Sequence, residues 1–273
     1  MGSLYLVATP IGNLEDITIR ALRVLREASL IAAEDTRIAR RLLQHYDIKA
    51  PLTVFHGDSP PTRAAEIVAA LEGGDVAVIS DAGMPGIADP GSELVRLAIE
   101  AGYPVIPIPG PSSVVAAAAA SGLTDEGFVY AGYLPRKEGE RRARLRELAA
   151  AGLPLIVFEA PTRIRALLEL LAEVYPDAEV VAGREITKLH EEWLRGPPAE
   201  LLEQLTERGE FTLVIRLPEQ HASVRQVDLD GLLARALAET NTLRDAVDRV
   251  IAETGLPRRA VYRRAVELRD GSD

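Results

Sequence analysis

Residues 76–91, VAVISDAGMPGIADPG, contain the pattern that decides the fold. The first four of them, Val76–Ile79, form an uncharged run rich in β-branched side chains, which predicts a strand buried on both faces of a sheet. Ser80–Gly91 follows as a loop with three glycines and two prolines, which is longer than a connection from a strand to a helix requires. Functional loops of parallel α/β sheets lie at the carboxyl ends of strands, so we expect this loop to bind a ligand.

Short apolar runs alternate with amphipathic segments on both sides of this stretch. The other strands expected in this half of the chain are Leu4–Ala8, Leu30–Ala33, Leu52–Phe55 and Val105–Ile108. The helices expected between or after these strands span residues 18–28, 36–46, 61–72, 91–101 and 112–120. Alternation of strands and helices predicts a mostly parallel sheet with helices on both faces.

The same alternation restarts after a polar, turn-rich segment at residues 121–127. The strands expected there are Phe128–Ala131, Leu155–Phe158, Val180–Ala182 and Thr212–Leu217, with helices at 138–150, 162–174 and 198–208. Residues 228–269 then show three helical periods and no strand pattern, a spacing that suits a helix–turn–helix. We therefore expect α/β domains with mostly parallel sheets over residues 1–121 and 122–219, and a small helical appendage resembling a helix–turn–helix over 220–273.

The composition excludes several classes of site. The chain has 273 residues, of which 47% are hydrophobic and none is cysteine, which excludes disulfides, thiolate zinc sites, iron–sulfur clusters and a cysteine nucleophile. The four histidines form no pair at metal-ligand spacing, so no metal is expected. No apolar run approaches the length of a membrane span, and the first residues lack the basic segment of a signal peptide, so we expect a cytoplasmic protein.

The charge pattern bears on nucleic-acid binding. A formal net charge of −10 argues against indiscriminate binding to nucleic acid. Arginine accounts for 28 of the 31 basic residues, and two segments, 136–147 and 255–269, are locally positive by +3 and +4. Such runs are usually solvated helix faces; alternatively they form a local surface for RNA phosphates. The candidate residues for that surface are Arg136, Lys137, Arg141, Arg142, Arg258, Arg259, Arg263 and Arg264.

Three further loops at strand ends are rich in small, polar or charged residues, at 9–14, 33–37 and 107–113. None matches a dinucleotide fingerprint or a Walker A motif. Ser112 and Ser113 fall at an expected helix N-terminus, which either binds an anion or is a simple N-cap. The segment Glu34–Arg37 offers an acid and a phosphate-binding cation for a substrate; alternatively Asp35 or Thr36 caps the next helix and Arg37 is a surface charge.

These segments occur in an order that resembles the tetrapyrrole methylase superfamily, in particular its branch that methylates small-subunit ribosomal RNA. The motifs that carry the resemblance are LYLVATPIGNL at 4–14, AEDTR at 33–37, SDAG at 80–83, PGPS at 109–112, GYLPRK at 132–137, REITK at 184–188 and RGEF at 208–211. Each motif is weak by itself, whereas the ordered set is specific and covers nearly the whole chain, including its C-terminal helices.

The resemblance implies two α/β domains with S-adenosylmethionine in the cleft between them, usually in a homodimer. It also implies 2′-O-methylation of a cytidine in the decoding region of 16S rRNA, either naked or in the small ribosomal subunit. Carried over by position, the cofactor contacts fall on Pro10, Asp81, Ala82, Gly83, Ile87, Ala88, Ser112, Ser113, Phe158, Ala160, Arg184 and Phe211. The chain departs from the family pattern at Met84, where threonine is usual, and at Thr162, where histidine is frequent.

Transfer of a sulfonium methyl group to a ribose hydroxyl requires the reacting atoms in line and benefits from a base that removes the hydroxyl proton. The catalytic candidates are Asp35 and Glu34 as bases, with Asp81 as a weaker one, and Arg37 and Lys188 as phosphate-binding cations. Two alternatives stay open. A small-molecule tetrapyrrole methylase has no need for the C-terminal helices or the arginine runs. A non-enzymatic nucleic-acid-binding regulator leaves the glycine- and proline-rich loops unexplained and predicts no cofactor binding.

Overall fold

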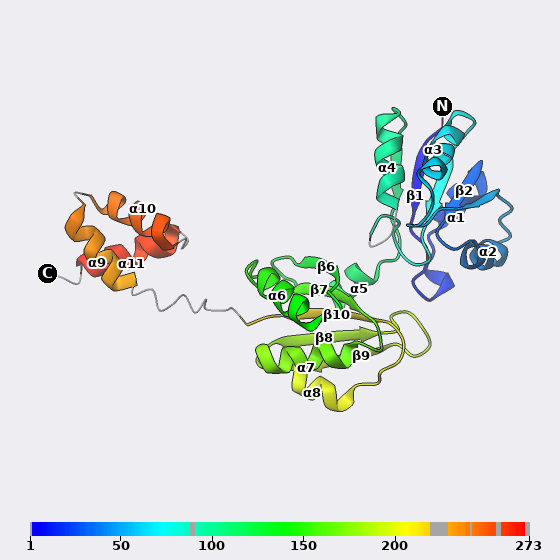
Figure 1. Ribbon diagram of the computed structural model, residues 1–273. Helices are drawn as coiled ribbons and strands as arrows, with labels where there is room; N and C mark the ends of the chain where they lie inside the picture. Colours follow the sequence, from blue (N-terminus) through cyan, green and yellow to red (C-terminus); the bar gives the residue numbers. More distant parts are fainter. Residues whose placement is uncertain (1, 88–90, 219–228, 241, 255–257, 271–273) are drawn as a thin grey trace. The chain divides into compact units, whose positions relative to one another are not determined.

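The computed structural model describes residues 2–87, 91–218, 229–240, 242–254 and 258–270. The chain divides into two compact units, residues 1–218 and 219–273 (Figure 1). The first unit contains two five-stranded sheets. Because both sheets lie in one unit, the domain boundary expected near residue 121 stays a prediction. None of the described helices is both long enough and apolar enough to cross a membrane.

The first sheet is entirely parallel, as expected. Its strands are β1 (Leu4–Val7), β2 (Leu30–Ala33), β3 (Leu52–Val54), β4 (Val76–Ile79) and β5 (Val105–Ile108), in the spatial order β3-β2-β4-β1-β5. All four residues of β4 are buried, because this central strand is covered on both faces. The sequence therefore places the loop that follows β4 at the middle of the carboxyl edge of the sheet.

Helices cover both faces of this sheet. They are α1 (Ile19–Glu27), α2 (Thr36–His45), α3 (Pro61–Ala69) and α4 (Gly91–Glu100), with short 3₁₀ turns η1 (Leu14–Asp16) and η2 (Ala70–Glu72). The apolar side chains of α1 and α2 pack in one cluster with Val7, Ile31 and Ile79. Those of α3 and α4 pack with Leu4, Val76 and Val78 on the opposite face. The alternate residues of each strand thus point into two separate core layers.

The second sheet differs from the expectation. Its strands are β6 (Val129–Tyr133), β7 (Leu155–Glu159), β8 (Glu179–Arg184), β9 (Glu192–Gly196) and β10 (Phe211–Arg216), in the order β6-β7-β10-β8-β9. Only β6 and β7 pair in parallel, whereas β10 is antiparallel to both β7 and β8, and β9 is antiparallel to β8. The expected mostly parallel arrangement is therefore wrong for this sheet, because an apolar run indicates a buried strand but not its direction.

The two faces of the second sheet are covered by different parts of the chain. On one face, α6 (Glu138–Ala149), α7 (Ile164–Val174) and α8 (Pro198–Gln204) contribute leucines to the core. On the other face lies α5 (Ser113–Ser121), whose Val114, Ala117 and Ala118 pack against Ile156, Val181 and Val214. Helix α5 follows the last strand of the first sheet directly, yet it packs on the second. It therefore brings the carboxyl edge of the first sheet to the strand ends of the second.

The C-terminal unit has the three helices that the sequence predicts. They are α9 (Leu229–Glu239), α10 (Leu243–Thr254) and α11 (Arg258–Asp270). Their common core is small and apolar, with Leu233, Val247 and Val261 fully buried. An ion pair between Arg264 and Asp230, 2.6 Å long, joins α11 to α9. The unit thus has a hydrophobic core of its own.

Candidate functional site

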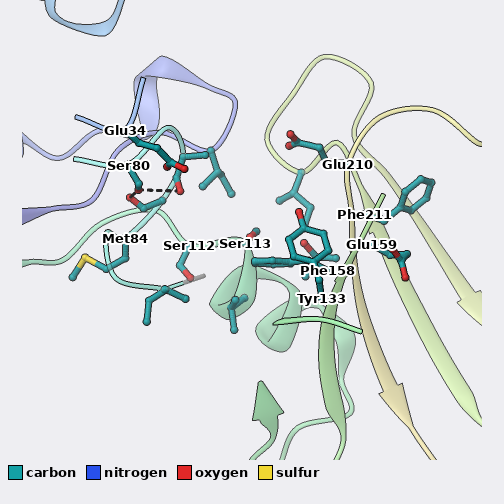
Figure 2. A pocket seen from close by; sticks show the side chains of 17 residues that line it. Glu34, Ser80, Met84, Ser112, Ser113, Tyr133, Phe158, Glu159, Glu210 and Phe211 are labelled. Carbon is teal, nitrogen blue, oxygen red and sulfur yellow. Dashed lines mark hydrogen bonds between the residues drawn. The ribbon is translucent and has the colours of Figure 1, made fainter. Parts of the chain in front are cut away.

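A cavity of about 230 Å³ lies where the loops of the two sheets meet (Figure 2). From the first sheet and the start of α5 it is lined by Ile11, Glu34, Ser80, Ala82, Gly83, Met84, Ile87, Ser112, Ser113 and Val114. From the second sheet it is lined by Tyr133, Phe158, Glu159, Ile186, Glu210, Phe211 and Thr212. In Figure 2, Glu34, Ser80 and Met84 lie on one side, with the aromatic residues and Glu159 opposite. We refer to this cavity as the pocket.

The loop after β4 is built onto the end of β1. The backbone N–H of Thr9 donates to the carbonyl of Gly83 at 2.9 Å, and the N–H of Gly83 donates back to the carbonyl of Thr9 at 3.1 Å. The buried Thr9 hydroxyl also donates to the carbonyl of Ser80 at 3.1 Å. Gly83 has a φ of +79°, a conformation that L side chains rarely adopt. This glycine therefore permits the turn that brings the loop backbone to the pocket wall.

The acidic cluster after β2 is split between two roles. Glu34 lines the pocket, whereas Asp35 is the N-cap of α2 and accepts the backbone N–H of Arg37 at 2.7 Å. The Arg37 side chain also pairs with Asp35 at 2.6 Å and remains 84% exposed. This side-chain hydrogen bond from Arg37 lowers the pKa of Asp35 from 3.8 to about 2. The capping interpretation is thus confirmed for Asp35, and such a carboxylate is a weak base at neutral pH.

Asp81, like Asp35, accepts a hydrogen bond from the backbone and does not line the pocket. One of its carboxylate oxygens accepts the N–H of Asp35 at 3.0 Å, which ties the loop after β4 to the start of α2. Neither residue is among those that line the pocket. Their carboxylates therefore order the two loops from which Glu34 and Gly83 reach it.

The loop after β8 brings a lysine close to the loop after β1. Lys188 pairs with Glu185 at 2.9 Å and with Glu210 at 3.0 Å. Burial would lower the pKa of Lys188, but its hydrogen bonds to Glu185 and Glu210 outweigh that effect and raise it. A Cβ on Gly12 would clash with Cγ of Lys188, so the glycine permits this approach. Lys188 is therefore a charged contact between two loops and lies outside the pocket lining.

Aromatic rings and a buried acid form the opposite wall. Tyr133 and Phe158 pack edge to face with ring centres 5.7 Å apart, and Phe211 belongs to the same lining. Glu159 is only 2% exposed. Its burial raises its pKa, against the effect of a 3.0 Å hydrogen bond from the N–H of Ala160 and of the ion pair with Arg163. This wall offers a flat apolar surface beside a hydrogen-bond acceptor.

The structure places the cofactor candidates unevenly. Those that line the pocket are Ala82, Gly83, Ile87, Ser112, Ser113, Phe158 and Phe211. Pro10 and Arg184 do not line it, and Arg184 instead pairs with Glu192 at 2.8 Å. Ala160 lines a second hollow beside the pocket, and Ala88 lies outside the described residues.

Sequence reasoning missed several lining residues, including Tyr133, Glu159 and Glu210. Each lies within, or next to, a strand or motif that the sequence pointed to. Tyr133 and Glu210 belong to GYLPRK and RGEF, and Glu159 follows the predicted strand Leu155–Phe158. The position of these three residues at or near strand ends is the feature of the sequence that could have identified them.

The arginine-rich segment of α6 is largely neutralised. Lys137 pairs with Glu140 at 3.0 Å, and Arg142 pairs with Glu173 at 2.9 Å. Arg141 is only 5% exposed, so the prediction that it belongs to an exposed basic surface is wrong. Its guanidinium instead donates to the backbone carbonyls of Pro135 and Arg136. Arg136 is exposed.

In the C-terminal unit, Arg263 is exposed and Arg264 is held by Asp230. The side chains of Arg258 and Arg259 lie outside the described part of the structure. Within the described residues, no group of three or more histidine, aspartate or glutamate side chains is placed to hold a metal ion.

Two family models match the chain. Residues 3–202 match the tetrapyrrole (corrin/porphyrin) methylases, and residues 224–269 match a model described as the RsmI C-terminal HTH domain. Among solved structures, uroporphyrin-III-C-methyltransferase from Thermus thermophilus is 25% identical with a TM-score of 0.54, covering 78% of this chain and 94% of its own. A diphthine synthase at 15% identity and a TM-score of 0.62, covering 78% of this chain and 90% of its own, shares the fold.

Two similar proteins match this chain over almost its entire length. The ribosomal RNA small subunit methyltransferase I of Micromonospora olivasterospora is 46% identical over 272 residues, which are 96% of this chain and 85% of that protein. The protein of the same name from Synechocystis sp. is 42% identical over 275 residues, 98% of this chain and 99% of that one. The chain therefore belongs to the tetrapyrrole methylase family and, within it, to the group of ribosomal RNA small subunit methyltransferase I proteins.

Proposed function

We propose that this protein transfers a methyl group from S-adenosylmethionine to the ribose 2′-hydroxyl of a cytidine in the decoding region of 16S rRNA. The observation that carries the proposal is the pocket, which gathers the glycine-rich loop after β4, the N-terminus of α5 and the aromatic wall. The near full-length similarity to proteins named for methylation of small-subunit ribosomal RNA supports the choice of substrate.

The residues of the pocket suit S-adenosylmethionine, which supplies an electrophilic methyl group when bound. The first turn of α5, with Ser112 as its N-cap, has backbone N–H groups that would suit the carboxylate of such a ligand. The ring of Phe158 offers an apolar surface for a purine. The carboxylate of Glu159 is a hydrogen-bond acceptor for an amino group of such a ligand.

We assign the role of base to Glu34. It lies at the end of β2 and lines the pocket, whereas Asp35 is held by Arg37 outside it. A carboxylate on the pocket wall can accept the proton of a ribose hydroxyl that is held beside the cofactor. Arg37 and Lys188 already have carboxylate partners, so they are weaker candidates for phosphate contacts.

The experiment that tests the function is a map of ribose methylation on small-subunit rRNA from cells with and without this protein. We expect one cytidine 2′-O-methyl group to disappear without the protein and to return when the gene is restored. If every 2′-O-methyl group persists, the RNA substrate is wrong, and methylation of a tetrapyrrole becomes the reaction to assay. Absence of S-adenosylmethionine binding by isothermal titration would contradict both enzymatic functions.

Gly83 provides a test of the pocket itself. Gly83→Val is expected to destabilise the fold by about 1–3 kcal/mol and to weaken S-adenosylmethionine binding roughly tenfold or more, because a branched side chain at positive φ strains the loop. Gly102 has the same φ of +79°, but a Cβ there would meet no atom within 4 Å, and the residue lies outside the pocket lining. Gly102→Val should therefore lose stability without losing cofactor affinity. Equal cofactor affinity of the two variants in titration calorimetry would contradict the assignment of the loop.

Salt is expected to separate the two binding partners. Affinity for RNA should fall at least roughly tenfold between about 50 and 200 mM salt, because phosphate contacts release counterions. Affinity for S-adenosylmethionine should stay nearly constant, since it carries no polyanionic backbone. Filter binding and calorimetry across the same salt series measure both, and RNA binding that does not respond to salt would contradict a role for the arginines.

We further propose that the protein acts as a homodimer, as the resemblance implies, and that it acts in the cytoplasm. Light scattering of the purified protein measures its mass in solution. A monomer at the concentrations used in the activity assay would contradict the dimer.

A further inference from the structure

A second hollow adjoins the pocket at Tyr133. It is lined by Tyr133 at the end of β6, by residues 134–136 in the turn that follows, and by Ala160, Thr162 and Arg163, which precede α7. Tyr133 lines both the pocket and this hollow. A ligand in the hollow would therefore lie directly beside the ligand of the pocket.

The turn that forms one side of the hollow is held in place by two guanidinium groups. Arg163 donates to the carbonyl of Leu134 at 2.7 Å. The buried Arg141 donates to the carbonyls of Pro135 and Arg136, both at 3.0 Å. Three consecutive carbonyls are thus hydrogen-bonded before any ligand arrives, which reduces the conformational entropy that binding would cost.

Arg136 differs from the other cations considered for RNA contact in the first unit. Lys137, Arg142, Arg37 and Lys188 each have a carboxylate partner, and Arg141 is buried. Arg136 is exposed, lines the hollow and has no ion-pair partner within the described residues. Its planar guanidinium therefore remains available for the bidentate hydrogen bonds that arginine makes to phosphate.

Tyr133 supplies the complementary surface. It is 60% exposed, although its ring is supported edge to face by Phe158. Exposed and supported aromatic rings are the usual platforms for unstacked RNA bases. The hollow thus combines a cation for phosphate with a ring for a base, and only Leu134 and Pro135 separate the two residues in the chain.

We propose that this hollow binds a nucleotide of the RNA substrate, with Arg136 on a backbone phosphate and the Tyr133 ring stacked against a base. The proposal rests on the proposed function and extends it, since it places the RNA strand on the second-sheet side of the pocket. It also gives Thr162 a location in the RNA site rather than in the cofactor site.

The test compares Arg136→Ala with Arg146→Ala. Arg146 is on the same arginine-rich segment, exposed and without an ion-pair partner in the described part of the chain, but it lines neither hollow nor pocket. Small ribosomal subunits from cells that lack this protein serve as substrate, with labelled S-adenosylmethionine. We expect Arg136→Ala to raise KM for the subunits roughly five- to tenfold and to reduce the salt slope by about one, with an unchanged affinity for S-adenosylmethionine. Arg146→Ala should change KM less than about twofold.

A pair of variants at Tyr133 tests whether its aromatic ring contributes to RNA binding. Tyr133→Ala should raise KM for the subunits roughly tenfold, and Tyr133→Phe should recover most of that loss, because stacking needs the ring and not the hydroxyl.

If Arg136→Ala and Arg146→Ala give the same KM for the subunits and the same salt slope, the hollow does not bind RNA. If the unmodified protein binds S-adenosylmethionine but methylates no subunit, the proposed function itself fails.

Discussion

Glu34→Gln is expected to lower kcat for methyl transfer roughly 100-fold while leaving the affinity for S-adenosylmethionine unchanged. The amide has nearly the same shape as the carboxylate, so it preserves the pocket wall, but it cannot accept the proton of the ribose hydroxyl. Loss of a general base typically costs about two to four powers of ten in rate. Single-turnover methyl transfer to small ribosomal subunits measures the chemical step, and calorimetry measures cofactor affinity.

Asp35→Asn is the matched control for this experiment. Asparagine also caps helices well, so α2 should keep its first turn. The change removes the negative charge that pairs with Arg37, which lies outside the pocket lining. We expect a rate close to that of the unmodified protein. A full rate for Glu34→Gln, or a larger loss for Asp35→Asn, would remove Glu34 from the mechanism.

Arg163→Ala is expected to lower the free energy of unfolding by about 3 kcal/mol at neutral pH, because it leaves the carboxylate of Glu159 buried without its partner. The Glu159 side chain is fully buried, and that of Arg163 is 20% exposed. The loss also frees the carbonyl of Leu134, which accepts from Arg163 at 2.7 Å. Chemical denaturation followed by circular dichroism measures the effect.

The pH dependence of this variant identifies the cause. Burial already raises the pKa of Glu159, and removal of Arg163 should raise it further. The folded state then holds a proton that the unfolded state releases, so stability falls as pH rises through the window between the two pKa values. The loss in free energy of unfolding caused by Arg163→Ala should therefore be smaller at about pH 5 than at about pH 7.

Arg165→Ala provides the comparison. Arg165 lies two residues further along, in the first turn of α7, and pairs with Glu207 at 2.6 Å, but both side chains are more than two-fifths exposed. Exposed ion pairs contribute little, so this variant should unfold almost like the unmodified protein at both pH values. A deficit of Arg163→Ala that is equal at both pH values would show that lost packing, rather than the buried carboxylate, is responsible.

Strand positions were predictable from the sequence, whereas strand direction in the second sheet was not. Val76–Ile79 and Leu30–Ala33 occur where their apolar runs predict, because a buried strand needs uninterrupted apolar residues. The strand Glu192–Gly196 was missed, since Leu194 is its single buried residue and charged residues surround it. Its position depends on pairing with β8, which is a contact between segments that local periodicity does not encode.

The candidate site was predictable at the level of loops rather than of side chains. The sequence points to the motif at 33–37 as a whole, and only the structure separates Glu34 on the pocket wall from Asp35, which caps a helix. Likewise, the run of arginines at 136–146 is uniform in sequence. Its members are distinguished by their surroundings in the fold: Arg142 pairs with Glu173 on another helix, whereas Arg141 is buried.

The strand order of the second sheet has a consequence for synthesis on the ribosome. Strand β10 is the last strand of this sheet to be made, yet it occupies the centre, between β7 and β8. The first sheet is complete once residue 108 has emerged, and it can fold while translation continues. Strands β8 and β9 have no partner linking them to β6 and β7 until Phe211–Arg216 is made. The pocket is therefore completed late in translation, when β10 closes the sheet and supplies Phe211 to its lining.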